Sequence, residues 1–346
     1  MSRSFLIASA ILVVASITGF SFAATTRRTT SGSTVVGSSR RTDRSDCALS
    51  QPANGRPSVL AVRIVRIDTG AVVLVNACID GAGPFPFVID SGSSFSIINK
   101  QVSRRFHLHE VGGAQQAAGI GCSTVVDPEQ LSSWSVGELA LRPQVVFSAS
   151  LPNLEPNQPL AGVIGSDVLS RFGSVRIDYQ KQTMSLGAAE SESPTANAVV
   201  RGPNSTSTPA QFVKDVRAEA PLTIVARQGG VVAYAPIRFD GSKAQLFAVD
   251  TGAAVSDISP LLARSLHLAN AHRSVELSAA FGCPVNLTEV KSGRWTLGST
   301  SLPAQLVASL PASGLKIAGL FGSDILSRFG AVVIDYRSAR IVLESG

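Results

Sequence analysis

The triplet Asp-(Ser/Thr)-Gly occurs twice in this chain of 346 residues, each time directly after an apolar run. The first copy reads Phe-Val-Ile-Asp-Ser-Gly and ends at Gly92, and the second reads Phe-Ala-Val-Asp-Thr-Gly and ends at Gly252. A single triplet of this kind is an ordinary turn signal. Two in matching register predict a molecule with a pseudo-twofold axis that brings two carboxylates, Asp90 and Asp250, together.

The two triplets belong to an internal duplication of the chain. Residues 162–179 align with residues 319–336, and thirteen of these eighteen positions are identical. Earlier landmarks pair as well, because Trp134 in the first copy corresponds to Trp295 in the second. Two copies are too few for a solenoid, so the duplication predicts a body with two lobes.

The amino-terminal residues have the pattern of an export signal. Arg3 is a short basic region, residues 5–20 are mostly apolar, and Ser21-Phe22-Ala23 resembles a cleavage site. We therefore predict a signal peptide over residues 1–23 and a protein that is periplasmic, on the cell surface or secreted. The alternative is an uncleaved membrane anchor, because residues 5–24 are nearly long enough to span a bilayer.

Composition divides the remaining chain into two lobes and two polar segments. Residues 24–57 are rich in Thr, Ser and Arg and predict a disordered stem, and the polar residues 188–220 predict a linker. The lobes are then residues 58–187 and 221–346. The formal net charge of +6 is concentrated before residue 58, so the body is nearly neutral and nucleic-acid binding is not expected.

Short runs of β-branched and aromatic residues, bounded by Gly, Pro or Asp, predict strands in both lobes. Short helices are expected after each triplet and within each copy of the 162–179 segment. The expected strands are 72–79, 85–89, 145–148, 175–179, 231–239, 246–249, 305–308 and 331–336, and the expected helices are 100–106, 166–171, 260–266 and 323–328. Strands dominate, and we predict an all-β fold in which each lobe is a small closed β-barrel with short helices.

Together these motifs resemble those of a known family. The first motif is two apolar residues followed by Asp-(Ser/Thr)-Gly-(Ser/Ala), and the second, some 70 residues later, is Gly-apolar-apolar-Gly-x-Asp-apolar-Leu. This pair of motifs resembles that of the retropepsin-like aspartic peptidases. Both motifs occur in both repeats, which together cover residues 58–346. The resemblance implies a pepsin-type active site between two lobes of one chain, and hence an exported aspartic endopeptidase acting on peptides or proteins.

The chemistry of paired aspartates agrees with this resemblance. Two carboxylates about 3 Å apart cannot both ionise, so Asp90 and Asp250 would share one proton. The ionised member takes a proton from a water that attacks the amide carbon, and the protonated member stabilises the oxyanion. This mechanism needs no metal or cofactor and predicts an acidic to mildly acidic optimum. The alternative reading is a pair of ordinary aspartates that cap turns.

The residues next to the aspartates are expected to support them. The resemblance implies that the hydroxyls of Ser91 and Thr251 tie the two loops together. A hydroxyl at Ser93 could donate to the carboxylate of Asp90, and Ala253 offers no such donor, so Asp90 is expected to ionise more readily than Asp250. The supporting residues of the catalytic loops are thus Ser91, Gly92, Ser93, Thr251, Gly252 and Ala253.

The second motif and the glycine-rich stretches add further expectations. By resemblance, the glycine motif packs beneath the catalytic loops, and Asp167 and Asp324 are expected to act as N-terminal caps or as partners of the helix dipole. The family places a mobile flap over the cleft at about this distance after each triplet, where residues 112–121 and 279–282 lie in this chain. Neither stretch contains a Tyr, so a glycine-rich flap of the retropepsin type is a better match than the tyrosine flap of pepsin. The alternative is an ordinary hairpin turn. The flap or substrate-binding residues would be Gly119, Ile120, Gly121, Phe281 and Gly282.

Four cysteines are compatible with two disulfides in an oxidising compartment, and the sequence does not choose among the three connectivities. They are Cys47, Cys78, Cys122 and Cys283. Cys122 and Cys283 occupy equivalent places in the repeats, so a link across the pseudo-axis is conceivable. His107 and His109 lack the further ligands of a metal site, and no metal is expected.

Two other functions are compatible with this sequence. One is a catalytically silent protein that binds a peptide, protein or glycan on the same scaffold. The other is a chain whose lobes pair with a partner chain. We favour a monomer in which the lobes form an intramolecular pseudo-dimer.

Overall fold

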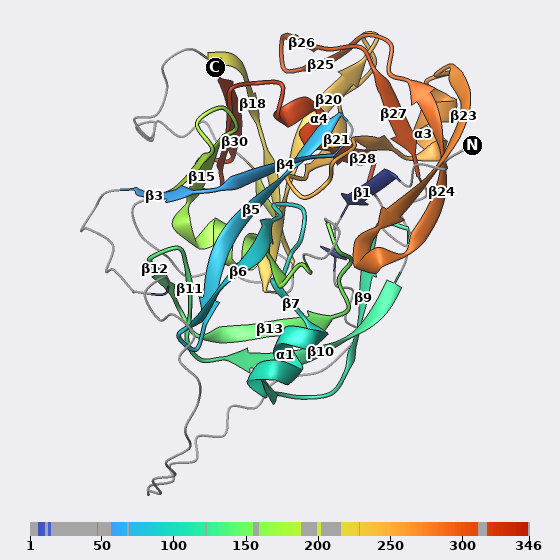
Figure 1. Ribbon diagram of the computed structural model, residues 1–346. Helices are drawn as coiled ribbons and strands as arrows, with labels where there is room; N and C mark the ends of the chain where they lie inside the picture. The colour runs from blue at the N-terminus through green and yellow to red at the C-terminus, as the bar shows by residue number, and fades with distance from the viewer. Residues whose placement is uncertain are drawn as a thin grey trace, which may run out of the picture.

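The computed structural model of the protein describes residues 6–10, 13–14, 47, 57–67, 69–121, 123–154, 159–187, 199–201, 216–227, 229–310 and 317–344. These residues fold mainly into β-strands, which form two twelve-stranded sheets and one six-stranded sheet. Figure 1 shows the first lobe in blue to green and the second in yellow to red, on either side of a common centre. The all-β, two-lobed fold agrees with the prediction.

The first lobe is built on one twelve-stranded sheet, in the order β12-β11-β5-β6-β14-β7-β13-β10-β9-β2, with β4 paired to β5 and β8 to β10. The strands are β2 (Val13–Val14), β4 (Arg63–Ile67), β5 (Gly70–Ile79), β6 (Ala82–Ile89), β7 (Ile97–Asn99), β8 (His109–Glu110), β9 (Gln115–Gly119), β10 (Ser123–Leu131), β11 (Trp134–Val136), β12 (Leu139–Leu141), β13 (Gln144–Ala149) and β14 (Gly162–Ile164).

The second lobe repeats this arrangement, in the order β1-β23-β24-β27-β22-β28-β21-β20-β19-β17, with β25 joining β20 to β26. The strands are β1 (Leu6–Ala10), β17 (Val199–Arg201), β19 (Thr223–Arg227), β20 (Gly230–Phe239), β21 (Gln245–Val249), β22 (Asp257–Ile258), β23 (Asn270–Ala279), β24 (Pro284–Lys291), β25 (Trp295–Leu297), β26 (Thr300–Leu302), β27 (Leu306–Ser309) and β28 (Gly319–Phe321).

A six-stranded sheet joins the two lobes along one side of the molecule (Figure 1). Its order is β18-β30-β29-β15-β16-β3, and the antiparallel pair β15–β29 at its centre joins the two repeats. The strands are β3 (Ser58–Ala61), β15 (Ser174–Asp178), β16 (Thr183–Leu186), β18 (Val216–Pro221), β29 (Ala331–Asp335) and β30 (Arg340–Glu344). The lobes therefore share backbone hydrogen bonds as well as packing.

The helices are short and lie where the sequence placed them. Helix α1 (Lys100–Phe106) and helix α3 (Pro260–Ser265) follow the two triplets, and α1 begins where the side chain of Asn99 accepts the N–H of Gln101. Helices α2 (Ser166–Leu169) and α4 (Ser323–Leu326) lie in the repeated segment. The first of these continues as a 3-10 turn over Ser170–Phe172.

The closed barrel expected for each lobe is not found in the described strands. Each large sheet runs as an open path of paired strands from one edge to the other. The third sheet accounts for part of the difference, because strands such as β15 and β29 pair across the two lobes instead of closing either one. A strand used to join two lobes is not available to close a barrel.

Two apolar clusters fill the molecule. The larger cluster contains Trp134 and Trp295, whose indole N–H groups donate to the carbonyls of Arg142 and Pro303. Both tryptophans are therefore core residues. The smaller cluster contains residues from both lobes around the loops that carry Asp90 and Asp250.

Several sequence expectations concern segments that the structure describes only in part. Of residues 24–57 only Cys47 and Pro57 are described, and much of 188–220 also lies outside the described residues. Cys47 forms a disulfide with Cys78. Cys283 is also disulfide-bonded, and Cys122 lies outside the described residues. Where the chain is described, no helix is long and apolar enough to cross a membrane.

Two amino-terminal strands lie along the long hairpins of the two lobes. Strand β1 pairs in parallel with β23, with Leu6 opposite Leu277 and Ala10 opposite Ala279. Strand β2 pairs antiparallel with β9, with Val13 opposite Gly119. This backbone segment thus adds a strand to the edge of each large sheet.

Candidate active site

Asp90 and Asp250 occupy equivalent places at the ends of buried strands. Asp90 follows β6, and its N–H donates to the carbonyl of Ile164 at 3.0 Å. Asp250 follows β21, and its N–H donates to the carbonyl of Phe321 at 3.1 Å. The acceptors lie on β14 and β28, which pair in parallel with β6 and β21. The repeated second motif therefore fixes the position of each aspartate.

The carboxyl groups are held in the same way in both lobes. Oδ1 of Asp90 accepts the backbone N–H groups of Gly92 and Ser93, each at 2.9 Å. Oδ1 of Asp250 accepts those of Gly252 and Ala253 at the same distance. The two carboxyl groups also interact with each other through a side-chain hydrogen bond. Each carboxyl is therefore held by its own loop on one side and by the opposite carboxyl on the other.

The two carboxyls face one another across the pseudo-axis. A Cβ atom at Gly92 would lie 2.6 Å from Cγ of Asp250 and 2.7 Å from its Oδ2. A Cβ atom at Gly252 would lie at the same distances from Cγ and Oδ2 of Asp90. Each glycine of the triplet thus supports the carboxyl of the opposite lobe, and any side chain there would collide with it.

Burial gives the pair unusual electrostatics. Asp90 and Asp250 are both 0% exposed. Burial, followed by the charge of Asp250, raises the pKa of Asp90 well above its ordinary value. Burial also raises the pKa of Asp250, against the N–H groups of Gly252 and Ala253 that stabilise its charge. Because two adjacent buried carboxylates repel, the pair keeps a proton at a pH where isolated aspartates are ionised.

Reciprocal hydrogen bonds tie the two catalytic loops together. Oγ1 of Thr251 donates to the carbonyl of Ile89 at 2.8 Å and accepts the N–H of Ser91 at 3.1 Å. Oγ of Ser91 donates to the carbonyl of Val249 at 2.9 Å and accepts the N–H of Thr251 at 3.1 Å. The link between loops that the family resemblance implied is present, with each hydroxyl serving the other lobe.

The role expected for Ser93 is wrong. Its hydroxyl donates to the carbonyl of Phe95 at 2.7 Å, whereas the backbone N–H donates to Asp90. Ala253 supplies the equivalent N–H to Asp250. The side-chain difference at this position therefore does not make one carboxyl more acidic than the other.

Asp167 and Asp324 are not the N-cap residues of helices α2 and α4, but each lies in the first turn of its helix, as expected for a partner of the helix dipole. The N-cap positions are Gly165 and Gly322, and neither has a side-chain cap. Asp167 instead accepts the hydroxyl of Ser96 at 2.8 Å, and Asp324 accepts that of Ser256 at 2.6 Å. These buried carboxyls therefore connect the second motif to the loop that follows each catalytic triplet.

The second motif packs beneath the catalytic loops, as the resemblance implied. The N–H of Ser166 donates to the carbonyl of Ser93, and that of Ser323 donates to the carbonyl of Ala253, each at 2.8 Å. A Cβ atom at Gly165 would lie 2.6 Å from the carbonyl oxygen of Phe95. The motif needs glycine because the backbone of the loop lies directly against it.

Contacts between the lobes include residues that the sequence did not single out. The hydroxyl of Ser323 accepts the N–H of Ala71 at 2.9 Å, and the hydroxyl of Ser166 accepts the N–H of Val231 at 3.1 Å. Each of these serines lies in one lobe and its partner in the other. Both copies of the repeat have a serine at this position, and that recurrence was the sequence signal for a shared structural role.

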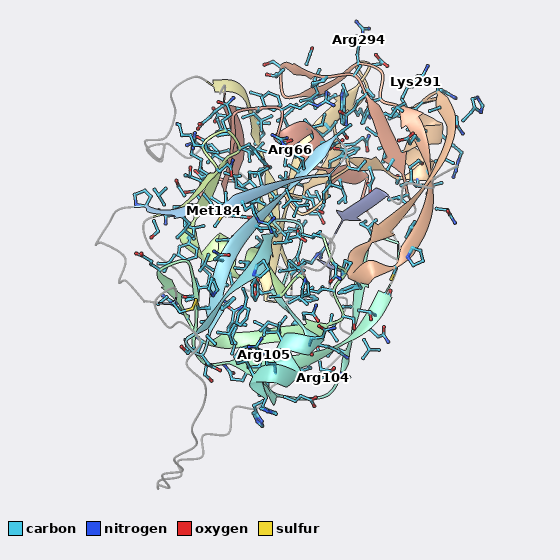
Figure 2. All side chains as sticks on the ribbon, viewed as in Figure 1. Arg66, Arg104, Arg105, Met184, Lys291 and Arg294 are labelled. Atoms are coloured by element: carbon cyan, nitrogen blue, oxygen red, sulfur yellow. A yellow bond between two sulfur atoms is a disulfide. The ribbon has the colours of Figure 1, made fainter. Side chains whose placement is uncertain are left out.

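The side chain of Arg66 also lies where the two lobes meet (Figure 2). It comes from β4 in the first lobe and donates to the hydroxyl of Ser327, at the end of α4 in the second, at 3.2 Å. The pseudo-axis is thus crossed by a side-chain contact outside the two triplets.

The glycine-rich stretches form the tips of two long hairpins, β9–β10 and β23–β24. Ile120 is 0% exposed and Phe281 is 9% exposed, and both belong to the apolar cluster that includes Phe95 and Ala253 of the catalytic loops. Gly119 is buried, Gly121 is half-buried with φ +82°, and Gly282 is exposed with φ +76°. The hairpin tips thus pack into the same apolar region as the loops around the aspartates.

His107 and His109 are exposed, and His107 occupies the left-handed position that ends helix α1. Its counterpart His267 is also exposed, with φ +52°, so both histidines lie just after the end of a short helix. No group of three or more metal-binding side chains occurs in the part of the chain that the structure describes.

Comparison with known proteins identifies the first repeat. Residues 75–168, which contain Asp90 and the first glycine motif, match the family described as aspartyl protease. No curated protein sequence matches the chain. Among solved structures, the crystal structure of an aspartic proteinase from Irpex lacteus is similar at 13% sequence identity and a TM-score of 0.45. The alignment covers 84% of this chain and 97% of that one.

The recognition made from the two sequence motifs is confirmed in the first lobe, where residues 75–168 match a family of aspartyl proteases.

Proposed function

We propose that this protein is an exported aspartic endopeptidase in which Asp90 and Asp250, one from each lobe, are the catalytic pair. The observation that carries the proposal is the reciprocal geometry of the two carboxyls. Each rests against the glycine of the opposite triplet, and the two carboxyls hydrogen-bond each other. Such a pair can hold one proton and act as acid and base together.

The proposed reaction divides the work between the two aspartates. The ionised carboxylate accepts a proton from a water, whose oxygen attacks the carbonyl carbon of the peptide bond. The protonated carboxyl stabilises the oxyanion and then helps to protonate the leaving nitrogen. The raised pKa of both groups supports activity at acidic to mildly acidic pH, where the pair retains one proton.

The pairing of strands β1 and β2 supports a peptide as the substrate. These strands add to the edges of β23 and β9, the outer strands of the two hairpins. An extended peptide that binds by strand addition needs the same open edges. We therefore propose that substrate pairs with the hairpins by backbone hydrogen bonds.

We also propose that the protein is exported and works as a monomer. The Cys47–Cys78 disulfide supports an oxidising compartment. Fractionation of producing cells tests the location, and a protein retained in the reducing cytoplasm would contradict it. The hydrogen bonds between the two catalytic loops of one chain support the monomer, which sedimentation of the active protein tests.

The decisive experiment is digestion of a diverse peptide pool between pH 3 and 7. Wild-type protein is compared with Asp90→Asn, with Asp250→Asn and with Glu129→Gln as a control. Glu129 is a buried carboxyl of the first lobe, and it accepts a hydrogen bond from the hydroxyl of Ser103. We expect both aspartate variants to lose about two to four orders of magnitude in rate. The control should cleave as the wild type does.

Two outcomes would contradict the proposal. Equal cleavage by wild type and either aspartate variant would exclude these residues from catalysis. Peptide binding without cleavage by the wild type at any pH would indicate the alternative, a silent binding protein on the same scaffold. A pepstatin-type inhibitor separates these cases further, because an active enzyme binds a transition-state mimic tightly.

A further inference from the structure

A third buried carboxyl lies close to the catalytic pair, in the second lobe only. Asp257 is the first residue of β22, and the equivalent residue of the first lobe is Ile97, the first residue of β7. Their strand partners correspond, because Asp257 lies opposite Leu320 on β28 and Ile97 lies opposite Val163 on β14. The duplication thus has an apolar residue in one lobe and an acid at the same place in the other.

Asp257 holds the strand that positions Asp250. Its Oδ1 accepts the N–H of Leu320 at 2.8 Å. The next residue on β28, Phe321, offers the carbonyl that accepts the N–H of Asp250. The two aspartates are therefore connected through one short strand.

The other oxygen of Asp257 has no partner. Asp257 is 3% exposed, and its Oδ2 atom is buried without a hydrogen bond among the residues that the structure describes. The charged groups that act on it are Asp250, in the loop after β21, and Asp324, in α4, and both are acidic. Strands β27 and β28 place Ala308 and Leu320 opposite it.

This environment favours the neutral acid. Burial raises the pKa of Asp257 to about 7, the N–H of Leu320 opposes that rise, and the charges of Asp250 and Asp324 add to it. The group is then protonated where the proposed reaction runs and ionises near neutral pH. Its negative charge would appear beside a pair that must keep one proton.

We propose that Asp257 is a positioning residue that is electrostatically coupled to Asp250 and extends the range over which the catalytic pair keeps its shared proton toward higher pH. The inference rests on the proposed function, because it concerns the proton of that pair. The physical reason is that a neighbouring negative charge disfavours ionisation of a carboxyl. Three coupled acids therefore release their last protons at higher pH than two.

The first test is the pH profile of kcat/KM for Asp257→Asn, which keeps an oxygen that can accept the N–H of Leu320. We expect the alkaline limb to move down by roughly half a pH unit or more, with little change on the acid side. Asp257→Ile copies the first lobe and loses the acceptor as well, so kcat should also fall across the whole range. Glu129→Gln is the matched control and should leave the profile in place.

The second test does not depend on catalysis or on a variant of Asp257. Carbon-13 NMR follows the carboxyl of Asp257 during titration of the full-length wild type and of Asp250→Asn. We expect Asp257 to titrate at lower pH in the variant, because the charge of Asp250 has been removed. An unchanged titration, or a pH profile of Asp257→Asn that coincides with the wild type, would overturn the inference. Absence of peptide cleavage by the wild type would contradict the proposed function but leave the NMR test valid.

Discussion

At the scale of single residues, the site depends on glycines that leave room for the opposite carboxyl. Gly92 and Gly252 do not have the positive φ that favours glycine for conformational reasons. They are required because a Cβ atom would lie 2.6 Å from Cγ of the opposite aspartate. The sequence indicated a tight turn here, but the contact between lobes could be seen only in the structure.

We predict that Gly252→Ala reduces kcat/KM by at least about tenfold, because displacing a reacting group by even 1 Å is costly. Gly113→Ala is the control, since a Cβ atom at Gly113 meets nothing within 4 Å and its φ is not in the left-handed region. Steady-state kinetics with one peptide substrate measures both variants. Wild-type activity in Gly252→Ala would show that the carboxyls do not face each other as described.

The hydroxyl of Thr251 gives a second residue-scale prediction. Thr251→Ala leaves the carbonyl of Ile89 and the N–H of Ser91 without their partner in a buried site. Each buried unsatisfied group costs about 1–3 kcal/mol, so the free energy of unfolding should fall by a few kcal/mol. Thr251→Ser keeps the hydroxyl and should retain most of the stability. Denaturant titration measures both, and equal loss in the two variants would contradict the role of the hydroxyl.

The sequence motifs predicted which residues form the site, but they did not predict all of the hydrogen bonds that these residues make. Both aspartates and the hydroxyls of the triplets lie where the duplication placed them. The hydroxyl of Ser93 could not be assigned from sequence, because a rotamer that reaches the carbonyl of Phe95 satisfies it equally well. The hydrogen-bond partner of Asp167 could not be assigned from sequence either, because a deeply buried carboxyl requires a donor and here the donor is Ser96.

At the scale of elements, each of the eight predicted strands overlaps a strand of the structure, although other strands such as β4 and β19 were not predicted. The hairpin strands β9 and β23 were missed, because their Gln, Ala, Ser and Gly residues have low intrinsic β-propensity. Their pairing with β10 and β24 stabilises them instead. The closed barrels were wrong because the sequence contains no signal that β15 pairs with β29 of the other lobe.

The sheet between the lobes provides the prediction for this scale. Arg176 on β15 donates to Glu344 on β30 at 2.8 Å and to Asp178 at 3.0 Å, and all three side chains are largely buried. Arg176→Met should lower the free energy of unfolding by about 3–5 kcal/mol, because it leaves buried carboxylates without their cation. The double variant Arg176→Met, Glu344→Leu should recover part of this loss. Urea denaturation compares them, and a double variant no more stable than the single one would contradict this account.

At the scale of the whole molecule, buried carboxyls make stability depend on pH. The pKa of Asp90, Asp167, Asp250, Asp257 and Asp324 is raised in the folded protein, in each case chiefly by burial. A raised pKa means that the folded state binds the proton more tightly than the unfolded state does. The stability from these groups is complete below their ordinary pKa of 3.8 and is lost as the pH rises through the folded values, to about 7 for Asp257.

We therefore predict that the protein unfolds at a higher temperature at pH 5 than at pH 7.5. Each group that titrates in this window contributes a slope of up to about 1.4 kcal/mol per pH unit. Asp178 has a lowered pKa and acts in the opposite direction, but only at more acidic pH. Thermal melts across this range measure the effect, with Asp257→Asn expected to flatten the curve. A Tm that rises steadily with pH would contradict it.

The last prediction concerns competition between the amino-terminal strands and substrate in the full-length chain. Both strands lie within the predicted signal peptide of residues 1–23, so all proteins are compared with these residues retained. Strands β1 and β2 occupy edges of β23 and β9 that a bound peptide would also use. Val13→Pro removes a backbone N–H and fits poorly within a paired strand, so it should weaken the contact of β2 with Gly119. We expect a lower KM for peptide substrates and an unchanged kcat, because displacing a competitor leaves the chemical step as it was. Full-length wild type and Ser33→Pro, a proline outside both strands, are the controls. A synthetic peptide of residues 6–14 should raise the KM of Val13→Pro again, because it competes for the same strand edges. Equal KM values for all three proteins would show that substrate does not bind by adding a strand to these hairpins.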